Sequence, residues 1–196
     1  HWCDNTIELI SRLDRDWEEV CSAFGMELND KIISISSGGD THNSGRAVTT
    51  VILTSGKSIV YKPRSVSLEN NFQELLRYFN FEFSSLNLKT MKVVEKDNYG
   101  WIEFIEPEQT CDQEQLEKYF LQLGALTAIT HPMHGVDFFF ENVIASKQGP
   151  VLIDLETLFH QSLEIESAKN ARENTQLILQ DSVLGMGILP QPQCQI

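Results

Sequence analysis

Residues that could bind phosphate and a divalent cation occur at four places along the chain. The first is a loop rich in glycine, and the second is Lys62, which ends a short β-rich run. The third is Asp137 with Asn142 five positions later, and the fourth is Asp154 at the end of an apolar run. A lysine can neutralise phosphate oxygens, and carboxylate and amide oxygens suit Mg²⁺. These residue types therefore indicate phosphoryl transfer.

The order of these four places is the order found in kinases. Asp137 and Asn142 have the spacing of the kinase loop H-R-D-x-x-x-x-N, in which the aspartate accepts a proton from the attacking hydroxyl. His134 stands where that loop has its His-Arg side, and Asn142 with Asp154 would bind the metal. Each feature alone has an ordinary explanation, such as a hairpin, a surface lysine or a turn-forming aspartate. Their joint occurrence favours the kinase-like interpretation.

The glycine-rich loop, residues 37–45, contains two residues that nucleotide binding alone does not require. Asp40 would be repelled by a triphosphate unless it is offset from it. His42, with an ordinary pKa of about 6.5, is suited to proton transfer, and Asp40 could orient it. The alternative is an Asx turn with a solvent-facing histidine. We expect this loop to have a second, acid–base task.

Hydrophobic periodicity predicts the elements that carry these residues. A first helix ends at Gly25, and its apolar stripe is Ile10, Leu13, Trp17, Val20 and Phe24. A second helix is predicted over 68–80. Strands are predicted over 31–36, 46–53, 57–61, 91–95 and 101–105.

A third helix is predicted after Asp112, which forms a capping pair with Gln115. This helix stops at His131-Pro132, and its predicted apolar face is Leu116, Phe120, Leu123, Leu126 and Ile129. Two strands, 143–145 and 151–153, follow it and flank a turn. A polar, helix-like region is predicted beyond residue 161.

Composition excludes several classes of protein. With 196 residues and 41% apolar side chains, the chain can bury a core, and its length suits one domain or two small ones. A formal charge of -13 argues against nucleic acid and anionic lipid as partners. No apolar run is long enough to span a membrane, so we expect a cytoplasmic protein. The four cysteines lack the spacing of a zinc site or a disulfide framework.

Several strings together resemble the dehydratase domain of class II (LanM-type) lanthipeptide synthetases, bacterial enzymes of lantibiotic biosynthesis. The resemblance runs from about Gly38 to the end of the chain. The strings are G-D-T-H-N at 39–43, V-Y-K-P-R at 60–64, residues 137–142, V-L-I-D-L-E-T-L-F at 151–159 and S-V-L-G-M-G-I-L-P at 182–190.

The resemblance implies an α+β fold that is lipid-kinase-like (protein-kinase-like) and has two lobes. Residues 1–30 would form a packing helix before the core. Residues 31–110 would form the N-lobe, with the glycine-rich loop and the lysine strand. Residues 111–196 would form part of the helical C-lobe. Because family members are much longer and the chain begins with His1, we expect an incomplete fragment.

The resemblance also implies a two-step reaction with ATP and Mg²⁺ as cofactors. Ser or Thr of a ribosomal precursor peptide, bound through its leader, is phosphorylated, and phosphate is then eliminated to leave dehydroalanine or dehydrobutyrine. By the match of motifs, Lys62 would bind the nucleotide and Asp137 would act in phosphorylation. Asp40 and His42 would act in elimination. The metal ligands would be Asn142, Asp154 and Glu156.

One position departs from the family pattern. Phe139 stands where the family usually carries a histidine, within D-x-H-x-E-N. Phenylalanine transfers no proton, so a pseudokinase that binds nucleotide or peptide is an alternative, as is a kinase without elimination activity. A zinc-dependent cyclase domain, which follows in family members, is expected as a further part of the enzyme and is absent from this sequence.

Overall fold

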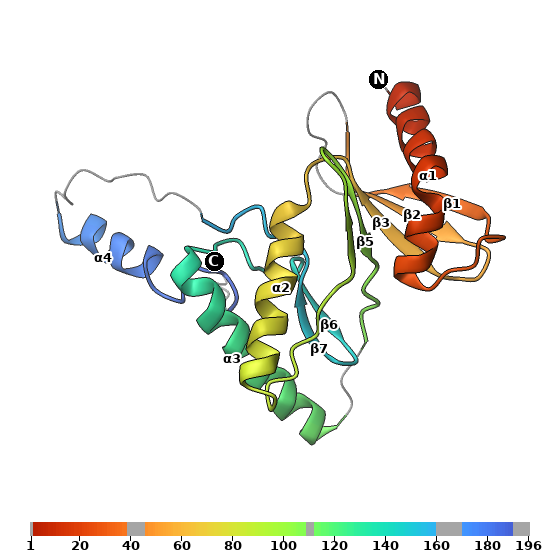
Figure 1. Cartoon of the computed structure of the whole chain (residues 1–196). Helices are drawn as coiled ribbons and strands as arrows, with labels where there is room; N and C mark the ends of the chain where they lie inside the picture. Colours follow the sequence, from red (N-terminus) through yellow and green to blue (C-terminus); the bar gives the residue numbers. More distant parts are fainter. Residues whose placement is uncertain (1, 39–45, 109–111, 160–169, 190–196) are drawn as a thin grey trace. The chain divides into compact units, whose positions relative to one another are not determined.

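The computed structural model describes residues 2–38, 46–108, 112–159 and 170–189 (Figure 1). The chain forms two compact units. The first contains His1–Leu76 and Thr90–Ile105, and the second contains Arg77–Lys89 and Glu106–Ile196. Both helices and strands are present, in agreement with an α+β composition. The lobe boundaries at 30/31 and 110/111 stay a prediction.

The first unit is built on a five-stranded sheet of order β1-β2-β3-β5-β4, in which neighbouring strands are antiparallel. The strands are β1 (Ile32–Ser37), β2 (Thr49–Leu53), β3 (Ser58–Lys62), β4 (Val93–Glu95) and β5 (Gly100–Glu103). Two helices accompany them, α1 (Trp2–Phe24) and the first part of α2 (Ser67–Glu82). All the predicted strands of this region are present, with ends that differ by a few residues.

Helix α1 lies along the sheet and supplies much of the core (Figure 1). It ends before Gly25, whose φ of 68° favours glycine, as predicted. The predicted stripe is wrong at Ile10, which is 47% exposed, because the buried row runs through Leu9 instead. The core residues that α1 and the strands share are Leu9, Leu13, Val20, Cys21, Val51, Leu53, Ile59, Tyr61 and Trp101.

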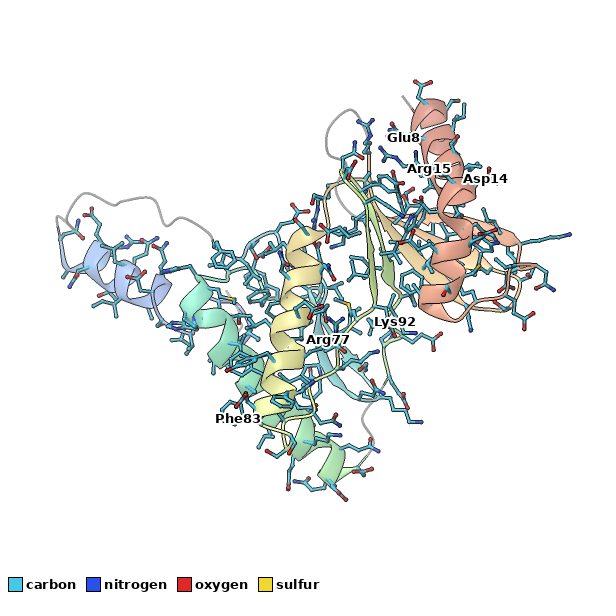
Figure 2. The ribbon with its side chains drawn as sticks, in the orientation of Figure 1. Glu8, Asp14, Arg15, Arg77, Phe83 and Lys92 are labelled. Atoms are coloured by element: carbon cyan, nitrogen blue, oxygen red, sulfur yellow. The ribbon has the colours of Figure 1, made fainter. Side chains whose placement is uncertain are left out.

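Hydrogen bonds between polar groups also hold α1 on the sheet. The carboxylate of Asp16, on α1, is 5% exposed and accepts hydrogen bonds from Tyr99 Oη at 2.7 Å and Trp101 Nε1 at 2.9 Å. Burial would raise the pKa of Asp16, but the hydrogen bonds from Trp101 and Tyr99 and the charges of Lys96 and Arg15 lower it below its ordinary value. Arg15 projects from the same helix (Figure 2).

Strand β1 is an edge strand with an unusual surface. Its six side chains are all exposed, and three of them, Ile32, Ile33 and Ile35, are isoleucines. It pairs with β2 on one side, with an irregular register between Ile32 and Ser34. It borders the glycine-rich loop, and Gly38 still donates its N–H to Val48 O at 3.1 Å.

The second unit combines helices with a short hairpin. Its elements, besides the end of α2, are α3 (Gln113–Thr130), the 3₁₀ turn η1 (His131–Met133), the hairpin β6 (Val143–Ser146) with β7 (Gly149–Leu152), and α4 (Ala171–Gln180). Asp112 caps α3 as predicted, by accepting from Gln115 N at 2.8 Å. The predicted apolar face of α3 is wrong at Leu116 and Phe120, which are exposed. The buried row is Gln122, Leu126, Ile129 and Thr130.

Gln122 joins three segments of the second unit. Its Nε2 donates to Leu86 O at 3.0 Å and to Asn87 O at 2.8 Å, both in the loop after α2. Its other amide atom, Oε1, lies against Gly149 at the tip of the hairpin, where an added Cβ would lie only 1.8 Å from it. Gly149 also has a φ of 135°, so both its backbone conformation and the space around it favour glycine, and the hairpin lies close to α3. None of the described helices is long and apolar enough to cross a membrane.

Candidate functional site

Lys62 forms a buried ion pair in the first unit. It ends β3, its residue is 5% exposed, and its Nζ donates to Oε1 of Glu69 at 3.0 Å. Glu69 comes from the first turn of α2 and is 0% exposed. In protein kinases, a lysine on a strand and a glutamate on the next helix must form this kind of pair before phosphate is transferred.

Arg64 is a second cation on the same carboxylate. Its Nη2 lies 2.8 Å from Oε1 of Glu69. Burial would raise the pKa of Glu69, but the charges of Lys62 and Arg64 and their hydrogen bonds lower it below its ordinary value. Glu69 is therefore an ionised carboxylate that forms ion pairs with two cations through the same oxygen.

Gly100 allows this cluster to form. It pairs with Lys62 across β3 and β5, and an added Cβ would lie 2.2 Å from Cγ2 of Val66 and 3.0 Å from the carbonyl oxygen of Val94. Val66 is fully buried and directly precedes α2. The missing side chain therefore lets the start of α2 approach the sheet closely enough for Glu69 to reach Lys62.

The loop from Asp137 to Asn142 lies in the second unit. Asn142 donates from Nδ2 to Asp137 O at 2.8 Å, and its own N–H donates to Phe139 O at 2.8 Å. Asp137 has a φ of 64°, which is uncommon for a residue with a side chain, and it is exposed. Phe138 is buried and anchors the loop, which leaves the Asp137 carboxylate at the surface.

Asp154 and Glu156 follow β7 and lie in a turn. Oδ1 of Asp154 accepts from Glu156 N at 3.3 Å, and Leu155 between them is buried. The turn lies beside the Asp137 loop, because Thr157 Oγ1 donates to Val136 O. The two ends of the hairpin also meet where Ile153 N donates to Asn142 O at 3.1 Å. The structure thus brings the predicted residues of this unit onto neighbouring segments.

The donor set of these segments fits magnesium. Mg²⁺ commonly uses one or two carboxylates and completes its shell with water and phosphate oxygens. Asp154 supplies a carboxylate, and because Asn142 donates from Nδ2, its Oδ1 is the amide atom that can accept a bond to a cation. Glu156 is exposed on the same turn. No three side chains of His, Cys, Asp or Glu gather as a metal site in the described ranges, so phosphate or water oxygens would have to complete the shell.

Phe139 packs on the segment after α4. Its ring lies so close to Gly187 that an added Cβ there would be 3.0 Å from Cε1, and Gly187 has a φ of 79°. Phe139 is 40% exposed and Phe140 is 89% exposed. Phenylalanine at 139 therefore has a packing partner that the sequence pattern did not reveal.

The two other predicted site residues, Asp40 and His42, lie outside the described residues. Lys62 belongs to the first unit, whereas Asp137, Asn142 and Asp154 belong to the second.

Glu69 was not predicted as a site residue. Its sequence signal is weak, since it is one of many acidic residues and stands in the first turn of a helix, where acidic residues are common. A glutamate in the helix that follows a candidate phosphate-binding lysine was the signal that could have identified it.

Comparison with known proteins places the chain in a family. It belongs to the family described as "Domain of unknown function (DUF4135)", which matches residues 1–195. It is similar to the "Lacticin 481/lactococcin biosynthesis protein LcnDR2" of Lactococcus lactis subsp. lactis, with 28% identity over 199 residues and 94% of this chain covered. The chain spans 21% of the length of that relative. The two findings confirm the resemblance to LanM-type lanthipeptide synthetases.

Proposed function

We propose that the chain is part of a lanthipeptide synthetase and carries the nucleotide-binding portion of a dehydratase with a lipid-kinase-like fold. The single observation that carries the proposal is the buried pair of Lys62 and Glu69, which has the form of the lysine–glutamate pair of kinases. The neighbouring loops of Asp137, Asn142 and Asp154 support it. The relative's part in lacticin 481 and lactococcin biosynthesis supports the same substrate class, a precursor peptide.

In the proposed first step, the hydroxyl oxygen of Ser or Thr in the peptide attacks the γ-phosphorus of ATP, and the bond to ADP breaks. Lys62 would hold phosphate oxygens and Asp137 would accept the hydroxyl proton. Mg²⁺, held by Asn142, Asp154 and Glu156, would supply charge neutralisation on the phosphates. The exposed position of Asp137 is compatible with a peptide substrate that arrives from solvent.

In the proposed second step, a base removes the α-proton of the phosphorylated residue. Its electron pair forms the double bond between Cα and Cβ, and phosphate leaves from Cβ with the bonding electrons. Asp40 and His42 are proposed for this acid–base chemistry, because histidine exchanges protons near neutral pH.

The test uses the full-length protein and a Ser/Thr-rich precursor peptide. Calorimetry should detect Mg-ATP binding, and mass spectrometry should show the loss of one water per modified residue. Lys62→Met should abolish both, since it removes the cation, and Asp154→Asn should weaken binding only when Mg²⁺ is present. The control Arg172→Met, at an exposed position on α4, should behave as the unaltered protein. Absence of Mg-ATP binding by the folded protein would refute the proposal.

The second candidate function, a pseudokinase, rests on Phe139. Phe139→His restores the residue usual in the family. Because the ring of Phe139 packs on Gly187, the effect of this substitution on stability can also be measured. If the native protein dehydrates the peptide, the enzyme is active with phenylalanine. If only Phe139→His is active, the native protein is a pseudokinase. A stable phosphorylated peptide would instead identify a kinase without elimination.

A further inference from the structure

A cavity of about 360 Å³ lies in the second unit, lined by α3 and by the turn of the β6–β7 hairpin, both of which Figure 1 labels. Ligand pockets usually have volumes of about 300–1,000 Å³, so this cavity is large enough for one. The buried residues of its lining are Gln122 and Gly149. Oε1 of Gln122 has no hydrogen-bond partner among the described residues. The cavity therefore has a polar lining in which hydrogen-bonding capacity is unused.

Two lysines line this cavity, Lys118 from α3 and Lys147 from the hairpin turn. Glu114 precedes Lys118 by four residues on the helix, a spacing at which opposite charges commonly pair. Neither lysine, however, forms an ion pair with a residue that the structure describes. Both side chains are exposed. Because the chain has 28 acidic and only 15 basic residues, two lysines without an acidic partner at one cavity indicate an anionic ligand.

Other groups of the lining suit a peptide backbone. Burial raises the pKa of the Tyr119 phenol, so its hydroxyl stays protonated and can donate a hydrogen bond. The carboxylate of Asp112 caps α3, whereas those of Glu108 and Glu114 can accept from N–H groups of a ligand. Each residue of a peptide other than proline offers one N–H and one C=O. Donors and acceptors together therefore favour an extended peptide, and the lysines favour acidic side chains on it.

We propose that this cavity is a docking site for an acidic segment of the precursor peptide, with Lys118 and Lys147 paired to its carboxylates. This inference rests on the proposed function, because it assigns where that substrate is held apart from the reacting Ser or Thr. Docking of one segment raises the effective concentration of the rest of the peptide at the candidate catalytic loop. The site therefore lowers the KM for the peptide and leaves the chemical step unchanged.

The hairpin sets the distance between the docking site and the loop of Asp137. Its turn lines the cavity, and its other end adjoins Asn142, whose Nδ2 donates to Asp137 O. Strand β6, between them, has four residues, which span about 13 Å. An extended peptide covers at most about 3.5 Å per residue. At least about four residues must therefore separate the docked segment from the Ser or Thr that reacts.

The test uses the full-length protein and two precursor peptides that differ only in charge. One carries an acidic segment, and in the other the Asp and Glu of that segment are replaced by Asn and Gln. Lys118→Glu/Lys147→Glu should raise the KM for the acidic peptide about tenfold, with kcat and the affinity for Mg-ATP nearly unchanged. The neutral peptide should have a high KM with the unaltered protein, and the double variant should not raise it further.

The matched control is Lys92→Glu/Arg172→Glu. It changes the net charge by the same amount at two exposed positions outside the cavity, and it should leave the KM for the acidic peptide nearly unchanged. If circular dichroism shows that Lys118→Glu/Lys147→Glu is unfolded, Lys118→Gln/Lys147→Gln replaces it. An acidic peptide with fewer than about four residues between the segment and the Ser or Thr should lose its advantage over the neutral peptide.

Fluorescence anisotropy of the labelled acidic peptide without ATP separates docking from catalysis. Loss of peptide binding in Lys118→Glu/Lys147→Glu, but not in the control, would support the site. Equal KM values for the two peptides with the unaltered protein, or an equal rise in the control variant, would overturn the inference and leave the proposed function intact. If the unaltered protein docks the acidic peptide but binds no Mg-ATP, the proposed function is overturned and the docking site stands.

Discussion

Asp16 and Glu69 show how single buried carboxylates organise the first unit. Each is almost fully buried, and each has its pKa lowered by cations and hydrogen bonds that outweigh the effect of burial. Asp16 holds α1 to the sheet through Tyr99 and Trp101, whereas Glu69 holds α2 to β3. Buried carboxylates therefore attach both α1 and α2 to the sheet, and only Glu69 lies at the candidate site.

Asp16→Asn tests the first of these attachments. An amide keeps the size of the side chain but loses the charge that Lys96 and Arg15 stabilise. We expect the free energy of unfolding to fall by about 1–3 kcal/mol, the usual effect for a hydrogen bond to a buried charged group. Urea denaturation followed by tryptophan fluorescence measures it. Asp14→Asn, at an exposed position of the same helix (Figure 2), should change stability little, and an equal loss would contradict the assignment.

Residue types predicted the candidate site only in part. Lys62, Asp137, Asn142 and Asp154 could be selected as candidates because their order along the chain is itself informative, and their roles stay a prediction. Glu69 could not, because its role depends on how closely α2 approaches β3, and that approach depends on contacts between distant residues. The packing of Phe139 on Gly187 was missed for the same reason.

At the scale of elements, most helices and strands were predicted, but their buried faces were less certain. Periodicity identified α1 and α3 correctly, yet it assigned Ile10, Leu116 and Phe120 to buried faces although they are exposed. A stripe of apolar residues shows which side of a helix is apolar. It does not show how far along the helix other segments of the protein cover that side. In α3, the polar residue Gln122 is buried instead, since its amide finds carbonyl partners in the loop after α2.

Gly100→Ala tests the close approach of α2 to the sheet. A methyl group there would overlap Val66 and approach the backbone of Val94. We expect a loss of about 1–3 kcal/mol in stability, as for other overpacked sites, together with weaker Mg-ATP binding. Gly124→Ala is the matched control, because nothing lies within 4 Å of its added Cβ and alanine favours a helix. If Val66→Ala does not relieve the defect of Gly100→Ala, the proposed overlap is not its cause.

Asp112→Ala tests the start of α3. The carboxylate caps the helix through Gln115 N, and its removal should lower stability by about 0.5–2 kcal/mol. Thermal unfolding followed by circular dichroism gives the change. Asp112→Ser retains a capping oxygen and should recover most of the stability. Equal losses in both variants would show that capping is not the contribution of this residue.

At the scale of the whole molecule, the predicted residues are divided between two units. Lys62 and Glu69 belong to the first, and Asp137, Asn142 and Asp154 belong to the second. Nucleotide binding as proposed therefore requires both units in one protein. The kinase-like order along the sequence indicated such a division, but the sequence alone could not define the extent of each unit, because residues 77–89 group with the second unit and residues 90–105 with the first.

Acid should destabilise the first unit. The pKa values of Asp16 and Glu69 lie below their ordinary values, so both contribute stability above a pH of about 4. That contribution is lost as the pH falls through the lowered pKa values, because protonation breaks the pairs. All three tryptophans, Trp2, Trp17 and Trp101, belong to this unit, so urea unfolding by fluorescence at pH 7 and at lower pH reports on it alone. The double variant Asp16→Asn/Glu69→Gln should show a flatter pH dependence, and an unchanged slope would contradict this account.

The edge strand β1 has a consequence for handling the protein. Its six residues, Ile32–Ser37, contain three isoleucines and no charge, and all are exposed. Short uncharged segments of this composition at a sheet edge pair readily with the same segment of another molecule. The charged residues beside it are Asp30 and Lys31 at its start. We therefore expect turbidity to develop in concentrated solutions of the purified chain, and a lysine in place of Ile33 to raise its solubility limit.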